Sequence, residues 1–209
     1  HIPRSIYPAT SINIKRSYWP SDDEENKCLL MMFNKLQELC DQFESSSNDS
    51  QHRLIRSGMG CFYNDSDAIR DVVGYLKSIR EATGVSSASL VVFYIILERF
   101  VAGVLFDFDE LIVFTPSAIR RLVLTAVFTS SKIYDADNPK EFWNCAKWAS
   151  VGGLTAQELH SLECRFMFGL RSIRFYVYRE GFDFAVKEIQ SDVRVEWPGR
   201  PPAPESAAA

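Results

Sequence analysis

The sequence predicts an all-α fold, and three observations lead to this prediction. Apolar residues recur at helical spacing in about seven segments. Helix-start patterns stand at Ser21, Thr115 and Thr155. The 209 residues are 46% hydrophobic and 24% charged, which is typical of a folded globular chain. We therefore expect one helical domain with a sizeable core, almost no strand, and irregular tails.

The N-terminal third predicts an arm, a helix and a loop. Residues 1–20 contain prolines, basic residues and scattered aromatics without a sustained period, so we expect an extended arm. Ser21-Asp22-Asp23-Glu24 is a capping box, in which the hydroxyl and the carboxylate bond reciprocal backbone N–H groups. Apolar residues then recur at helical spacing, which predicts an amphipathic flanking helix over 24–44. The serine-rich stretch after it predicts irregular structure through residue 64.

Two further helices are expected before residue 110. Ser66 or Asp65 could cap the first, which carries Ile69 on its buried face and ends at Gly84. Ser86 could cap the second, which is apolar nearly throughout and runs to about Ala102. Its longest apolar run, residues 88–97, is too short to cross a bilayer, so we expect a central buried helix. Residues 106–110 then form an acidic, aromatic connector.

A helix starting at Thr115 carries a charge on an apolar face. Thr115 can cap free N–H groups, and Pro116 lacks a donor that would be unsatisfied there anyway. Lys132 falls in line with Leu124 and Phe128, so its ammonium group needs a partner or must reach solvent.

A second charge on an apolar face, that of Glu163, lies in the helices that follow. Pro139 starts a short helix through residue 148, and Gly152-Gly153 then breaks the chain. A capping box over 155–158 restarts it, and Glu163 falls within the apolar stripe of the next helix. The stripe contains Leu159, Leu162, Phe166 and Leu170. A carboxylate there needs a cation or donors, so Lys132 and Glu163 either neutralise each other inside the fold or meet a partner.

The C-terminal part predicts a short extended segment over 175–178 and a helix over 178–190, with Phe182, Phe184 and Ile189 among its apolar residues. From Pro198 onward the sequence is rich in proline and alanine, and we expect a disordered tail over 191–209.

Composition and motifs exclude several functions. The net charge of −4 argues against nucleic acid as the main partner. Five cysteines without a C-x-x-C pair indicate neither a disulfide framework nor a zinc site, so we expect a reducing compartment, the cytoplasm or the nucleus. Asp107, Asp109 and Glu110 fit a solvated loop better than a metal site. No cofactor motif is present, and we expect no bound metal or cofactor.

The sequence contains little evidence of a catalytic site. His160 and Cys164 lie four residues apart on one helix, but the spacing supplies no third group to orient the histidine. A buried cysteine and a surface histidine explain them better, so we expect no enzyme. A scattered basic set could meet an acidic or phosphorylated regulator or substrate, although a solvated helix face is the favoured interpretation. The set contains Arg120, Arg121, Arg165, Arg171, Arg174 and Arg179.

Several motifs carry a family resemblance. The segment from Thr115 reads TPSAIRRLVLTA and is followed by Ser131-Lys132, and the later segments read WASVGGL and ELHSLE with Phe166 behind them. Together with Glu98-Arg99 upstream, these motifs resemble the cyclin box, and specifically the phosphate-regulon or P/U-type cyclins. His160 stands where that family usually has asparagine. The resemblance covers roughly Ser66 to Val177.

The resemblance implies a single five-helix cyclin box over residues 65–177, braced by one flanking helix on either side. It implies a regulatory subunit that binds and activates a cyclin-dependent protein kinase in cell-cycle or nutrient and phosphate signalling. A cyclin-fold adaptor or transcription-type scaffold without a kinase remains the alternative. We expect no membrane or nucleic-acid partner. The implied kinase contacts are Lys132, Glu163, Phe128, Phe166 and Ile173, where Ile173 takes the place of a frequent aromatic residue.

Overall fold

The structure is a computed structural model, and it describes residues 19, 21–46, 59–108, 114–135, 144–170 and 176–191. The predictions for the arm before Trp19, for the tail after residue 191, and for Asp109, Glu110, Pro139, Arg171, Ile173 and Arg174 lie outside these residues.

The described residues form an all-helical domain without strands, as the sequence predicts. The α-helices are α1 (Asp22–Ser46), α3 (Val72–Thr83), α4 (Ser87–Phe108), α5 (Pro116–Tyr134), α7 (Cys145–Val151), α8 (Ala156–Leu170) and α9 (Arg179–Gln190). Two short 3₁₀ helices, η3 (Gly60–Phe62) and η4 (Asp65–Asp67), precede α3.

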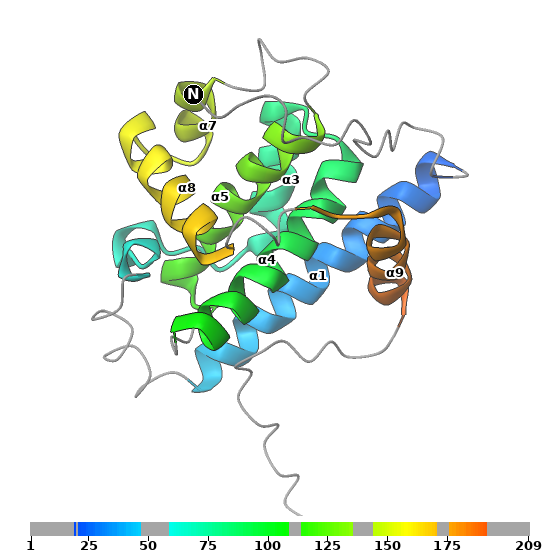
Figure 1. Ribbon diagram of the computed structural model, residues 1–209, viewed down its shortest axis with the longest axis horizontal. Helices are drawn as coiled ribbons and strands as arrows, with labels where there is room; N and C mark the ends of the chain where they lie inside the picture. The colour runs from blue at the N-terminus through cyan, green and yellow to red at the C-terminus, as the bar shows by residue number, and fades with distance from the viewer. Residues whose placement is uncertain are drawn as a thin grey trace, which may run out of the picture.

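Helix α4 is the central helix of the fold. It packs against α1, α5, α8 and α9, and Figure 1 shows α7 and α8 on one side of it and α1 and α9 on the other. Residues 90–97 are all buried. The apolar stretch is longer than the run over 88–97 suggests: Ser87–Leu105 is long and apolar enough to cross a membrane, but 78% of that window is buried inside the fold. Burial among neighbouring helices accounts for its apolar sequence on all sides.

Helix α5 is buried over most of its length, including its hydroxyl side chains. Thr125 Oγ1 donates to Arg121 O at 2.7 Å, and Thr129 Oγ1 donates to Thr125 O at 2.8 Å. Ser130 and Ser131 donate to carbonyl oxygens three residues earlier. Because each hydroxyl bonds the helix itself, these residues can be buried without unpaired donors.

The start of α3 differs from the prediction. Ser66 and Asp65 do not cap it; they lie in η4, and α3 begins at Val72, where the Asp71 carboxylate accepts from Gly74 N at 2.7 Å. The reason is a long-range contact. The segment before α3 bonds the first residues of α5, through Ile69 N to Pro116 O and Asn64 N to Ser117 O, each at 2.9 Å. Gly84 ends α3 with φ of 69°, as predicted.

Two other helix boundaries also differ. Pro116 is the first residue of α5 as expected, but Thr115 makes no side-chain cap, since its hydroxyl lies 3.1 Å from the Ser117 hydroxyl instead. Helix α4 continues past Ala102 to Phe108, and Gly103 lies buried within it. Residues 106–108 are therefore helix and not connector.

The flanking helices pack on each other and on the centre. Lys35 of α1 donates to Glu188 O in the last turn of α9 at 2.8 Å and to the carbonyl of Ser191, just after that helix, at 3.0 Å. Phe182 and Ile189 are buried, but Phe184 is 68% exposed, so it lies on the outer face of α9 and not in the core.

Candidate functional site

The C-terminal end of α5 and the middle of α8 meet at Lys132 and Glu163. Lys132 Nζ lies 2.6 Å from Glu163 Oε1 and 2.8 Å from Glu163 Oε2. The Lys132 side chain is 31% exposed and that of Glu163 is 13% exposed. The two charges that the sequence left without partners therefore pair with each other, and the pair remains open to solvent.

Aromatic side chains support the pair from α5 and α7. The Lys132 ammonium group lies 4.2 Å from the centroid of the Phe128 ring, one turn earlier on α5. Phe128 in turn contacts Trp148 of α7, with 5.4 Å between ring centroids. Both rings are almost completely buried. The position of Lys132 is thus fixed by a carboxylate on one side and a buried ring on another.

Phe128 and Phe166, which the resemblance implies as partner contacts, have no exposed surface in this structure. Phe166 stacks on Phe100 of α4 with 4.3 Å between ring centroids, and so joins α8 to the central helix. Both phenylalanines are therefore buried in the fold and are not part of the surface around the pair.

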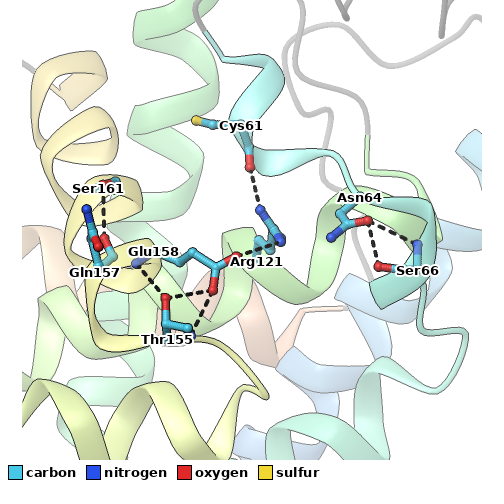
Figure 2. A network of polar contacts seen from close by, with 8 residues as sticks. All are labelled: Cys61, Asn64, Ser66, Arg121, Thr155, Gln157, Glu158 and Ser161. Atoms are coloured by element: carbon cyan, nitrogen blue, oxygen red, sulfur yellow. Dashed lines mark hydrogen bonds and ion pairs between the residues drawn. The ribbon is translucent and has the colours of Figure 1, made fainter.

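The capping box at Thr155 fixes the beginning of α8. Thr155 N donates to Glu158 Oε2 at 2.8 Å, and Glu158 N donates to Thr155 Oγ1 at 3.2 Å (Figure 2). This is the reciprocal pair that the sequence predicts. Gly153, with φ of 66°, provides the turn before it, which favours glycine.

Arg121 joins α5 to both η3 and α8. Figure 2 shows its guanidinium group between Cys61 and Glu158: Nη1 donates to Cys61 O at 3.0 Å, and Nη2 lies 3.7 Å from Glu158 Oε1. The side chain is 12% exposed, so the favoured prediction of a solvated basic face is wrong for Arg121. In the sequence, Glu158 of the capping box was the only signal for the contact with Arg121. Its presence does not indicate which arginine pairs with it.

Comparison with known proteins places this arrangement in a family. A family model for cyclins matches residues 23–171, which is more than half of the chain. The chain belongs to the cyclin family. The match begins inside α1 and ends just after α8.

Individual relatives of this cyclin are plant U-type and P-type cyclins. Cyclin-U4-2 of Arabidopsis thaliana is 30% identical over 131 residues, which are 60% of this chain and 55% of that protein. Cyclin-P2-1 of Oryza sativa subsp. japonica is 32% identical over 131 residues, 62% of this chain and 55% of that protein. The chain thus spans about half the length of the curated relatives it matches. Cyclins are regulatory proteins and in general not enzymes.

Other groups of this cyclin lie around the pair on α8. His160 Nδ1 lies 3.8 Å from Glu163 Oε2, and Cys164 Sγ lies 3.8 Å from His160 Nε2. Cys164 is exposed, so the expectation of a buried cysteine is wrong. Met167 and Phe168, further along α8, are 40% and 57% exposed. Within the described ranges, no group of three or more His, Cys, Asp or Glu side chains could hold a metal ion.

Proposed function

We propose that this cyclin is the regulatory subunit of a cyclin-dependent protein kinase, which it binds through the surface around Lys132 and Glu163. The proposal rests on one observation in a chain of this family. The ion pair between α5 and α8 is supported by the buried Phe128 ring and remains partly exposed to solvent.

The geometry of the pair suits recognition of a partner. Lys132 has three N–H donors and the Glu163 carboxylate accepts more bonds than Lys132 supplies, so both can bond the backbone of a docked kinase. Charged groups at such a position determine register and specificity more than affinity.

Apolar surface for affinity lies further along the same helix. Met167 and Phe168 are the exposed large hydrophobic residues of α8 in the described structure. Methionine and aromatic residues are enriched at the centres of protein interfaces. The pair would thus orient the kinase while Met167 and Phe168 contribute contact area.

The cyclin would act by differential affinity and not by chemistry. A partner that binds the active conformation of a kinase more tightly than the inactive one shifts the population toward the active form. Activation then requires no catalytic group on the cyclin.

A binding and activation assay with purified cyclin-dependent kinases tests this proposal. Lys132→Glu and Glu163→Ala should each weaken binding at least about tenfold and reduce activation in parallel, because either change leaves a charge unpaired at the interface. Arg179→Glu is the matched control, since Arg179 pairs with Asp183 at 3.1 Å on the exposed face of α9. Tight binding and full activation by both site variants would contradict the proposal.

A charge-reversed double variant separates an internal role from a partner contact. Lys132→Glu combined with Glu163→Lys restores an ion pair with opposite polarity, so thermal stability should recover relative to the single variants. Kinase binding should remain lost, because the partner groups would then face charges of the wrong sign. Recovery of both properties would mean that the pair serves the fold alone.

A further inference from the structure

The Lys132–Glu163 pair is the end of a longer chain of contacts along α8. Cys164 Sγ lies 3.8 Å from His160 Nε2, the other ring nitrogen lies 3.8 Å from Glu163 Oε2, and Glu163 is held by Lys132. A nucleophile, a base and a carboxylate that faces the base are thus adjacent on one helix. Glu163 lies three residues after His160 on the same helix, and the fold adds Lys132 of α5, which binds Glu163.

The order of these groups favours a reactive thiol. A carboxylate facing Nδ1 favours the tautomer that carries its hydrogen there, which leaves Nε2 as an acceptor facing the Cys164 thiol. His160 can then take the thiol proton, and the resulting imidazolium is stabilised by Glu163. The thiolate that remains is the nucleophilic form of cysteine.

The other four cysteines are in different environments, and all five lie in described residues as free thiols. Burial raises the pKa of Cys28 to about 11, and burial also raises the pKa of Cys61 and of Cys145. Cys40 is buried and donates to Phe114 O at 3.1 Å. Cys61 is the other exposed cysteine and serves as an internal comparison.

We propose that Cys164 is a thiol-modification site that reacts with a low-molecular-weight disulfide of the glutathione class, and that the adduct blocks the surface around Lys132 and Glu163. The Cys164 thiolate attacks one sulfur of the disulfide, so that a new S–S bond forms as the old one breaks. The departing thiolate takes the proton held by His160. Cys164 is oxidised, and half of the disulfide leaves as a free thiol.

The position of Cys164 connects this chemistry to partner binding. It follows Glu163 directly in the chain, and its side chain is exposed on the helix that also exposes Met167 and Phe168. A glutathione adduct adds a bulky group with charged carboxylates beside Glu163, where it would exclude a docked kinase. The part of the proposal in which the adduct blocks kinase binding, its regulatory half, rests on the proposed function. The reaction of Cys164 with the disulfide does not.

The first experiment needs no partner. The purified full chain is treated with oxidised glutathione, and adducts at each cysteine are followed over time by peptide mass spectrometry. Cys164 should react at least about tenfold faster than Cys61, and His160→Gln should slow Cys164 by at least about tenfold, which is less than the roughly hundredfold or more that a general base usually contributes. Ser161→Ala, a change at a neighbouring exposed residue, is the control and should leave both rates unchanged. Equal rates at the two cysteines, or a Cys164 rate that does not depend on His160, would overturn the proposal.

The second experiment measures kinase binding before and after oxidation. Wild type treated with oxidised glutathione should lose at least about tenfold in affinity, while Cys164→Ser should bind equally with and without the oxidant. Oxidised wild type that binds as tightly as the reduced protein would overturn the regulatory half. Failure of the reduced protein to bind any kinase would count against the proposed function, and the reaction rates would still decide whether Cys164 is the reactive thiol.

Discussion

Gly152 lies directly against Leu124, so that a Cβ atom added at Gly152 would overlap the end of the Leu124 side chain and come 3.2 Å from its Cγ. This contact brings the turn between α7 and α8 onto α5. Leu124 is completely buried, so its side chain has little room to move away.

The first prediction concerns this contact. Gly152→Ala should lower the free energy of unfolding by about 1–3 kcal/mol, the usual cost of overpacking a core. Adding Leu124→Val should recover part of that loss by removing the overlapping atoms, which denaturant unfolding can measure. Simple additivity of the two changes would mean that Leu124 is not the source of the cost.

The second prediction compares two phenylalanines. Phe166→Ala should cost about 3–5 kcal/mol, because it leaves a cavity beneath α8 where the Phe166 ring stacks on Phe100. Phe184→Ala removes the same atoms from a side chain that is 68% exposed, and should change stability by no more than about 0.5 kcal/mol. Thermal or denaturant unfolding of the two variants gives the comparison. Similar losses would contradict the assignment of Phe166 to the core and Phe184 to the surface.

The third prediction concerns the capping box of α8. Thr155→Ala removes the hydroxyl that accepts from Glu158 N and should cost about 1 kcal/mol. Thr155→Ser keeps the hydroxyl and should stay close to wild type. Amide hydrogen exchange should show faster exchange in the first turn of α8 for the alanine variant alone.

The fourth prediction is a pH dependence at the contact between α4 and α9. Burial raises the pKa of Glu98 above its ordinary value, the Glu188 carboxylate raises it further, and Arg99 opposes the shift. The folded protein then holds this proton more tightly than the unfolded chain. The stability that Glu98 contributes is therefore fully present below the ordinary pKa, and it is lost as the pH rises through the raised value.

Glu98→Gln removes this titration and tests the sign. The melting temperature of the variant minus that of wild type should be larger at neutral pH than at a pH near the ordinary pKa of glutamate. Glu188→Gln should behave in the same direction, because burial also raises the pKa of Glu188, with Lys35 opposing. A difference that is the same at both pH values would contradict the raised pKa of Glu98.

Predictions from the sequence succeeded where the relevant contacts are local. The reciprocal bonds of Thr155 and Glu158 join residues three apart, and the bond from Ser89 N to Ser86 Oγ has the same spacing. Such pairs depend on helix geometry alone, so a short motif is sufficient to predict them. The left-handed end of α3 at Gly84 is predictable for the same reason.

Predictions failed where a distant segment competes for the same groups. Residues 64–69 resemble a helix start, but they bond the beginning of α5 instead. Arg121 resembles a solvated arginine, but it donates to the carbonyl of Cys61, sixty residues away. Cys164 is a different case, because it lies on the solvent side of α8, away from the face that Leu162 and Phe166 bury.

By itself, the sequence determined that the chain is helical, where most of its helices lie, and that Lys132 and Glu163 are charges on apolar faces that need partners. Only the tertiary structure decided that they pair with each other across 31 residues and remain partly open to solvent. The reason is physical. Helical periodicity and caps depend on neighbours within about four residues, whereas the pairing of two distant side chains depends on how α5 and α8 pack against the central helix.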